Sequence, residues 1–231
     1  MIIGNGLIAK EFKKNENFYE EYVIFASGVS NSKTTNLNDY DRELTLIQNY
    51  LNLNDNIKFI YFSSCSIFDE SLKNSMYVQH KLKMEEYILN NFKNYLIYRL
   101  PIVVGFSQNP NTLTNFIYNS IIKMQNIDIY KYACRYLIDV EDVIMLVDKT
   151  LKENNKIINL SLGNKIDIHE LVKIFEKLLE CKAKKSFIDK GSCYEIDNFY
   201  IKKFIKEIKI EEYNYNLVAK YYMHKKGEIL V

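Results

Sequence analysis

The chain has 231 residues, with 31 Lys and Arg against 29 Asp and Glu, so its formal net charge is +2. This balance argues against a nucleic-acid-binding protein, and 48% hydrophobic with 26% charged residues argue against wholesale disorder. No apolar run approaches the ~18 residues of a membrane span, and the N-terminus lacks a basic signal-peptide region. The cysteines and histidines are scattered along the chain. We therefore expect a cytoplasmic protein with no metal site, no disulfide framework, and no nucleic-acid or membrane partner.

Apolar segments and amphipathic segments alternate along the chain. Short apolar runs predict strands at 1–3, 22–27, 57–63, 94–100 and 157–162. Helical periodicity predicts helices at 7–18, 40–53, 75–92, 110–125 and 168–179. Strands that alternate with helices form βαβ units, so the expected fold class is α/β, with a Rossmann-like parallel sheet flanked by helices.

A glycine-rich turn joins the first predicted strand to the first predicted helix. Gly4-Asn5-Gly6-Leu7-Ile8-Ala9 has the pattern G-x-G-x-x-A, in which the first glycine allows a tight turn and the second lets backbone approach a pyrophosphate. The small third residue lets helix and strand pack closely, and the helix N-terminus presents free N–H groups to phosphate. The turn therefore indicates a dinucleotide site, with an ordinary strand-to-helix turn as the alternative.

Two further groups of polar residues could carry chemistry. Ser63, Ser64 and Ser66 lie at the end of the strand predicted at 57–63, and parallel sheets place ligands at the carboxyl ends of their strands. Tyr77 and Lys81 are four residues apart on one face of the next predicted helix, where the Lys charge would favour the phenolate. Taken alone, the serines are also typical of caps and turns, and the Tyr–Lys pair of a solvated helix face.

In their order, these motifs resemble the short-chain dehydrogenase/reductase superfamily, specifically its extended NAD-dependent epimerase/dehydratase branch acting on sugars. Tyr61–Asp69 (YFSSCSIFD) is similar to the branch's S-S-x-x-V-Y-G, Arg135–Val143 (RYLIDVEDV) to R-x-F-I-H-V-x-D-V, and Ile158–Gly163 (INLSLG) to its Y-N-v-G segment. The similarity spans about residues 1–180. It implies a reduced cofactor-binding region at 1–155 and a C-terminal substrate-binding or cap region at 156–231, within one compact unit.

The resemblance also implies roles for individual residues. Tyr77 would be the acid/base, Lys81 would lower the phenol's pKa and hold the nicotinamide ribose, and Ser64 would hydrogen-bond the reacting oxygen. Ser66 would be a second donor to the substrate. The other residues implied to contact the cofactor lie in the glycine-rich turn and at the strand ends: Gly4, Gly6, Leu7, Ile8, Ala26, Ser27, Ser63 and Pro101. Ser30 and Lys33 are further candidates from their own chemistry.

The chain also departs from the branch's pattern. Only about a dozen residues separate the first helix from the strand at 22–27, which aligns with the family's fourth strand, so the second and third strands are expected to be missing. These strands carry the residue that recognises the cofactor ribose or its 2′-phosphate. Ser30-Asn31-Ser32-Lys33 is a candidate replacement and favours NADP, with NAD as the alternative and a plain solvated loop as the other interpretation.

The substrate side departs from the pattern as well. Ser64-Cys65-Ser66 stands where 4,6-dehydratases carry T-D-E, which disfavours dehydration, and Ile102 replaces an Asn that often contacts a nucleotide-sugar diphosphate. Arg135 is interpreted either as a substrate phosphate ligand or as a structural ion-pair partner of Asp139 or Glu141. Arg42 is interpreted as a solvated helix residue.

The sequence thus predicts an NAD(P)-dependent reductase of a sugar carbonyl, on a nucleotide-linked sugar or a sugar phosphate. One alternative is a nucleotide-sugar 4-epimerase that retains its cofactor. The other is a binding protein that has lost the cofactor chemistry together with the missing strands. A homodimer is left open.

Overall fold

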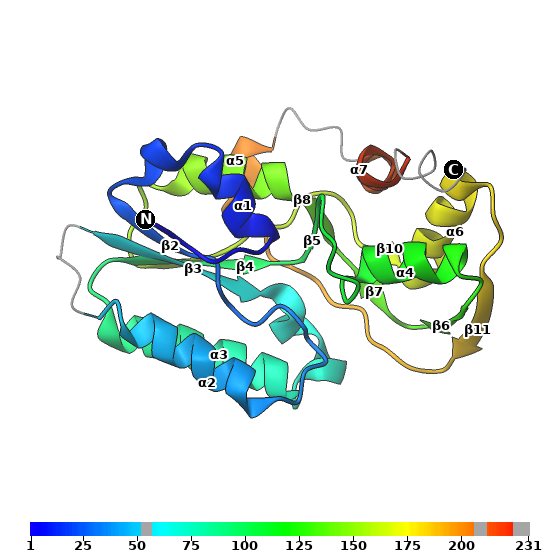
Figure 1. The fold of residues 1–231 in the computed structure, drawn as a ribbon, viewed down its shortest axis with the longest axis horizontal. Coiled ribbons are helices and arrows are strands. Elements are labelled where there is room, and N and C mark those ends of the chain that lie inside the picture. The colour runs from blue at the N-terminus through cyan, green and yellow to red at the C-terminus, as the bar shows by residue number, and fades with distance from the viewer. Residues whose placement is uncertain (52–56, 206–211, 224–231) are drawn as a thin grey trace. The chain divides into compact units, whose positions relative to one another are not determined.

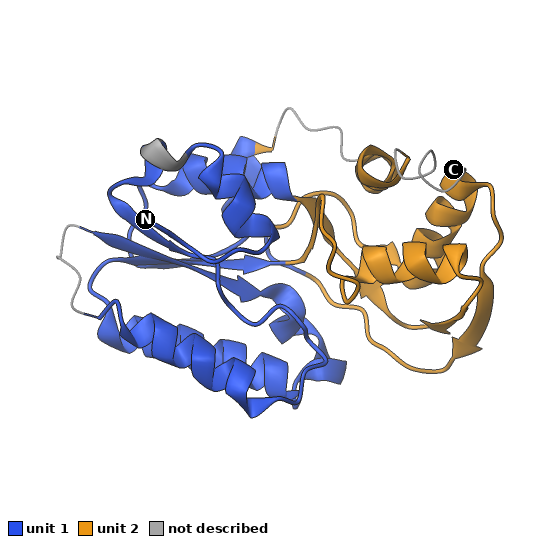
Figure 2. Ribbon diagram, viewed as in Figure 1, with its two compact units in different colours: residues 1–100, 140–160, 196–204 blue, residues 101–139, 161–195, 205–231 orange. Residues whose placement is uncertain are grey.

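The computed structural model describes residues 1–51, 57–205 and 212–223, and its compact parts are two units (Figure 2). Unit 1 comprises Met1–Leu100, Val140–Leu160 and Ile196–Phe204. Unit 2 comprises Pro101–Asp139, Ser161–Glu195 and Ile205–Val231. The chain passes between the units several times, so each unit is assembled from separate segments.

Unit 1 is built on a five-stranded sheet with the order β1-β2-β3-β4-β9, and every neighbouring pair is parallel. The α/β fold with a Rossmann-like parallel sheet is therefore confirmed. In the described sheet β1 pairs only with β2, so β1 is an edge, as expected for a chain that lacks two strands of the first half. The strands are β1 (Ile2–Ile3), β2 (Tyr22–Phe25), β3 (Lys58–Ser64), β4 (Tyr95–Leu100) and β9 (Lys156–Asn159).

Helices cover both faces of this sheet, with α1 and α5 on one face and α2 and α3 on the other (Figure 1). All seven residues of β3 are buried, as expected of a central parallel strand covered on two sides. The main helices of the unit are α1 (Leu7–Lys13), α2 (Leu37–Gln48), α3 (Met76–Asn91) and α5 (Val140–Thr150). Short 3₁₀ helices are Glu16–Tyr19, Cys65–Phe68, Glu70–Leu72 and Lys202–Phe204.

Side chains of three strands and two helices form the core beneath the α2–α3 layer. Each fully buried aliphatic or aromatic side chain contributes about 1.5–3 kcal/mol through removal of apolar surface from water. This core fixes α2 and α3 against the strands whose ends carry the predicted site. Its members are Val23, Phe25, Ile47, Phe59, Tyr61, Met84, Ile88 and Ile97.

The element limits follow the sequence predictions with local differences. The helix predicted to run to Phe18 ends at Lys13, because the polar run from Lys13 to Asn17 offers no apolar residue to continue the buried stripe. The strand predicted to end at 162 ends at Asn159. The helix predicted at 168–179 is observed with these limits.

The described residues of unit 2 form three small sheets and three helices. β5 (Ile102–Val104) pairs with β8 (Leu137–Asp139) and β6 (Asn126–Tyr130) with β11 (Lys184–Ile188), both parallel, whereas β7 (Cys134–Arg135) and β10 (Ile166–Asp167) are antiparallel. Its helices are α4 (Leu113–Ile122), α6 (Ile168–Leu179) and α7 (Tyr213–Tyr222). The periodicity predicts α4 and α6, but it predicts neither the short strands nor α7.

Candidate functional site

The glycine-rich turn between β1 and α1 combines a tight side and an open side. Gly4 has a φ of +121°, which favours glycine, and a Cβ there would lie 2.3 Å from the carbonyl oxygen of Ala26 at the end of β2. Gly6 is the N-cap of α1, and a Cβ on it would meet nothing within 4 Å. Leu7 and Ile8 are partly buried. A ligand can therefore approach the backbone at Gly6, while Gly4 is pressed against β2.

An arginine reaches the same end of β2. Arg42, exposed on α2, donates from Nη1 to the Ser27 hydroxyl at 3.1 Å and from Nη2 to the Ser27 carbonyl at 2.9 Å. Ser27 in turn abuts the turn, since a Cβ on Gly4 would lie 3.1 Å from its backbone nitrogen. The position of Arg42 on an exposed helix face agrees with the sequence interpretation, but its guanidinium is fixed rather than simply solvated.

The two candidate replacements for the missing ribose contacts are exposed. Ser30 and Lys33 lie on the loop between β2 and α2. The backbone N–H of Lys33 donates to the side chain of Asn31 at 3.1 Å, which holds this part of the loop in a local turn. Both side chains are thus open to solvent on a short, internally bonded loop.

The serines at the end of β3 have different surroundings. Ser63 is buried and donates to Glu85 at 2.5 Å, and Glu85 is held in a bidentate pair by Arg99. Ser64, at the last position of β3, accepts a hydrogen bond from the backbone of Ser66 at 3.1 Å and so caps the following 3₁₀ helix. A hydroxyl that accepts a bond still has its own proton to donate. Ser64, which is also buried, and the half-buried Ser66 therefore each keep a hydroxyl proton to donate, whereas Ser63 is committed to an internal network.

Tyr77 lies in the first turn of α3. The helix begins at Met76 because the Ser75 hydroxyl accepts from the backbone of Val78 at 3.2 Å, an N-cap that removes one unsatisfied donor. Tyr77 is half-buried, and its hydroxyl makes no hydrogen bond to any residue in the described part of the chain. α3 also packs against the 3₁₀ helix that Ser64 caps. The phenol is thus free to bond a ligand.

Lys81 is directed into the protein. Its ammonium lies 5.9 Å from the centre of the Tyr77 ring and is almost fully buried. It donates to Glu43 at 3.0 Å, to the Tyr61 hydroxyl at 3.0 Å and to the Phe62 carbonyl at 3.5 Å. These three bonds use all three N–H donors of a Lys side chain.

The partner of Lys81 is a buried carboxylate on α2, Glu43. It accepts from the Tyr61 hydroxyl and from the backbone N–H of Val29, each at 2.6 Å, and His80 Nε2 lies 3.1 Å away. Burial pushes the pKa of Glu43 up, but the Lys81 charge and these hydrogen bonds outweigh it and hold the pKa well below its ordinary value. Burial and the neighbouring Glu43 raise the pKa of Tyr61.

Glu43 is the residue that the sequence interpretation missed. A signal for it exists, because Tyr40, Glu43 and Ile47 are all buried and recur at the three- and four-residue spacing of one helix face. A carboxylate on such an apolar stripe needs a buried cation or several donors. The Lys81 of the motif one helix later is such a cation.

The two remaining predicted residues belong to unit 2. Pro101 directly follows Leu100, whose partner across the unit 1 sheet is Ser64. Arg135 donates from Nη1 to the carbonyls of Cys134 at 2.6 Å and Ser192 at 3.4 Å, and its guanidinium lies 5.9 Å from the centre of the Tyr194 ring.

A disulfide joins Cys134 on β7 to Cys193, so the expectation that the cysteines form no disulfide is wrong. The 59-residue separation hides the pairing from the sequence, because only the fold of unit 2 brings the two cysteines together. Cys65 and Cys181 are free.

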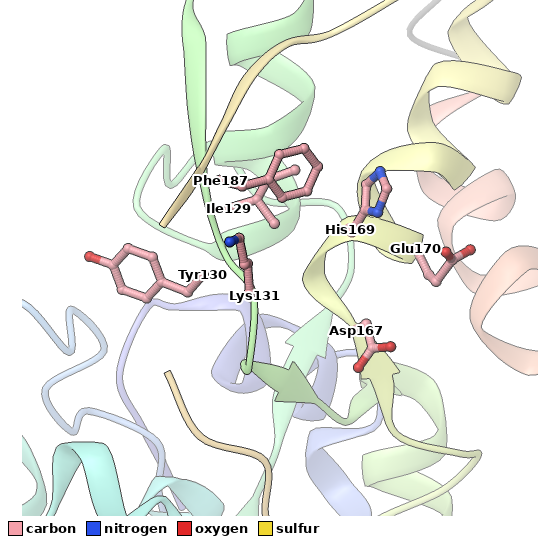
Figure 3. A pocket seen from close by; sticks show the side chains of 7 residues that line it. All are labelled: Ile129, Tyr130, Lys131, Asp167, His169, Glu170 and Phe187. Atoms are coloured by element: carbon pink, nitrogen blue, oxygen red, sulfur yellow. The ribbon is translucent and has the colours of Figure 1, made fainter. Parts of the chain in front are cut away.

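Unit 2 also contains a cavity of about 310 Å³ beside the start of α6 (Figure 3). His169 and Glu170 come from α6, and His169 meets Phe187 edge-on at 5.0 Å. No predicted site residue lines this cavity, whose walls are Ile129, Tyr130, Lys131, Asp167, His169, Glu170 and Phe187. Across residues 1–51, 57–205 and 212–223 we find neither a cluster of side chains suited to a metal ion nor a helix long and apolar enough to cross a bilayer.

Within unit 1, the structure therefore gathers the glycine-rich turn, the end of β2 and Arg42 through direct contacts. It brings Tyr77 and the serines of the β3 end onto neighbouring elements. It turns Lys81 and Ser63 toward buried carboxylates.

Comparisons with known proteins show which solved structures have a similar fold. No protein-family model and no curated protein sequence matches the chain. Among solved structures, the chain resembles RMD from Pseudomonas aeruginosa complexed with NADPH. The identity is 14% and the TM-score 0.72, over 97% of this chain and 98% of that one.

Two further similar structures contain NAD. The dTDP-glucose 4,6-dehydratase of Bacillus anthracis is 16% identical, with a TM-score of 0.69 over 98% of this chain and 80% of that one. The UDP-glucuronic acid 4-epimerase of Bacillus cereus, which also contains UDP-glucuronic acid, is 17% identical, with a TM-score of 0.67 over 94% and 79%. The resemblance drawn from the sequence is confirmed at the level of the fold.

Proposed function

We propose that the protein is an NAD(P)-dependent oxidoreductase of the short-chain dehydrogenase/reductase type that reduces a carbonyl group of a sugar, either nucleotide-linked or phosphorylated. The observation that carries the proposal is the free hydroxyl of Tyr77, on the helix that packs against the turn capped by Ser64. The solved structures of similar fold support a nicotinamide cofactor, because their descriptions name NAD or NADPH.

The glycine-rich turn fits the pyrophosphate of such a cofactor. The space around Gly6 admits a ligand to the backbone, and the N–H groups of the first turn of α1 are the donors that phosphate oxygens require. Ala26, Ser27 and Pro101 are proposed to flank the cofactor, which when bound supplies the hydride. We propose NADP, because Ser30 and Lys33 offer a hydroxyl and a cation on an exposed loop, and NAD is the alternative.

The protein's own part in the reaction is to bind the substrate oxygen and move its proton. Ser64 donates a hydrogen bond to the carbonyl oxygen, and Ser66 is a second donor. Tyr77 gives its hydroxyl proton to the same oxygen as the carbonyl becomes an alcohol, and the resulting phenolate takes a proton from solvent. Arg135 is proposed to bind a phosphate of the substrate.

Lys81 acts in this proposal through its charge. Its ammonium is 5.9 Å from the Tyr77 ring, close enough to stabilise negative charge on the phenol oxygen. Glu43 offsets part of that charge, and the three bonds of Lys81 leave no donor for the nicotinamide ribose unless one of them is exchanged. Lys81 is therefore assigned an electrostatic role, and the ribose contact implied by the resemblance is made only by such an exchange.

The substitution of Tyr77 by Phe tests this mechanism. Tyr77→Phe removes only a hydroxyl that bonds nothing else, so we expect it to leave folding and cofactor affinity intact while lowering turnover at least ~100-fold. The assay follows NADPH consumption with UDP- and dTDP-linked 4-keto sugars. Tyr87→Phe on the same helix is the matched control and should retain activity. Full activity in Tyr77→Phe would overturn the mechanism. Epimerisation without net NADPH consumption would select the 4-epimerase.

A further inference from the structure

Arg42 is positioned beside the glycine-rich turn by a chain of close contacts. Its guanidinium holds both the hydroxyl and the carbonyl of Ser27, at 3.1 and 2.9 Å. Ser27 and Ala26 form the wall against which Gly4 is pressed, since a Cβ on Gly4 would lie 3.1 Å from one and 2.3 Å from the other. The guanidinium is therefore fixed at the end of β2. The strand that leads into the turn, β1, pairs with β2 (Figure 1).

The guanidinium has donors to spare and no anionic partner. An Arg side chain has five N–H donors, and Arg42 uses two of them on Ser27. No carboxylate pairs with it in the described part of the chain. The other two arginines differ, because Arg99 forms a bidentate pair with Glu85 and Arg135 donates to backbone carbonyls. Arg42 is thus the arginine whose charge is left to bind an anion.

The edge position of β1 explains why a cation on this side matters. In the described sheet β1 has a neighbour only on the β2 side, so no strand on its other side supplies a residue to the turn. Two cations lie near the turn. Lys13 of α1 donates to the Gly4 carbonyl at 2.9 Å and to the Asn5 side chain at 3.2 Å, whereas Arg42 of α2 reaches the adjoining end of β2. A planar guanidinium suits phosphate because its paired N–H groups match two oxygens.

We propose that Arg42, positioned by Ser27, binds a phosphate group of the dinucleotide and supplies the recognition that the missing strands would have provided. This inference rests on the proposed function. The phosphate is either the 2′-phosphate of NADPH or the diphosphate that NADPH and NADH share. Comparing the affinities of the two dinucleotides distinguishes these alternatives.

The test compares dinucleotide affinities of the wild type and Arg42→Ala by calorimetry. A charge-assisted hydrogen bond lost from a binding site weakens binding about 10- to 100-fold. Arg42→Lys keeps the positive charge but loses the paired N–H groups of the guanidinium, so it should weaken binding by a smaller factor. Lys152→Ala removes an exposed positive charge elsewhere in unit 1 and should leave both affinities unchanged. Because Arg42 is exposed, unfolding curves of the variants should match that of the wild type.

Each outcome decides the proposal. A loss confined to NADPH assigns Arg42 to the 2′-phosphate, and an equal loss for NADPH and NADH assigns it to the diphosphate. Unchanged affinity for both in Arg42→Ala overturns the inference. If the wild type binds neither dinucleotide, the proposed function fails, and inorganic pyrophosphate becomes the probe: weaker binding to Arg42→Ala than to Lys152→Ala still supports an anion site, and no difference rejects it.

Discussion

Substitution of Glu43 by Gln gives the sharpest test of how the site is held together. The carboxylate is fully buried and accepts from Tyr61, Val29 and Lys81 at 2.6, 2.6 and 3.0 Å. An amide keeps one acceptor oxygen but turns an NH₂ group toward donors, so at least one buried donor loses its partner and the Lys81 ammonium loses its counter-charge. Breaking a buried ion pair from one side costs about 3–5 kcal/mol.

Urea unfolding followed by circular dichroism measures this cost. Glu86→Gln, on the exposed side of α3, is the matched control and should change the free energy of unfolding by less than about 0.5 kcal/mol. The double variant Glu43→Gln with Lys81→Met should recover part of the loss, because it removes the unpaired charge as well. A loss of under about 1 kcal/mol in Glu43→Gln would refute the reasoning, since it would mean that no buried donor depends on the carboxylate.

The pH dependence of the Glu43 effect has a fixed sign. The folded-state pKa of Glu43 lies below that of the unfolded chain, which is about 4.3 for a Glu. The stabilisation is therefore complete above the unfolded pKa and is lost as the pH falls through the folded pKa. The difference between wild type and Glu43→Gln should be constant from about pH 6 upward and should shrink below about pH 4.

Two more predictions concern the backbone and the cysteines. Gly4→Ala should destabilise the protein by more than about 1 kcal/mol, since its Cβ would lie 2.3 Å from the Ala26 oxygen and its φ of +121° disfavours alanine. Thermal unfolding measures this change, and an unchanged Tm would contradict the described turn. Alkylation of the denatured, unreduced protein should label two of the four cysteines and leave Cys134 and Cys193 unmodified. Labelling of all four would contradict the disulfide.

Sequence periodicity predicts the parallel sheet of unit 1, because the strands of this sheet are continuous apolar runs and the helices that cover it are amphipathic. The G-x-G-x-x-A motif locates the glycine-rich turn, since only glycine tolerates the contact of Gly4 with Ala26. The short strands of unit 2 are not predicted, because two- and three-residue strands such as β7 and β5 are too short for a period to emerge.

The polar contacts of the site depend on tertiary structure in a way that the motifs do not contain. Tyr77 and Lys81 share a helix face as their spacing predicts, but the ammonium turns toward Glu43, which comes from a different helix. Arg42 looks like a solvated residue in the sequence, because its partner Ser27 lies 15 residues earlier, just after β2. Local patterns therefore identify candidate residues, whereas the packing of α2 on β3 and α3 determines what each one bonds.

The proposed function requires that the protein bind a nicotinamide cofactor, which titration of the purified protein with NADPH and NADH by calorimetry measures. We expect at least one dinucleotide to bind with one site per chain, and NADPH to bind more tightly than NADH. Absence of binding by both, together with no cofactor released when the protein is denatured, would contradict the account and leave a binding role without hydride transfer.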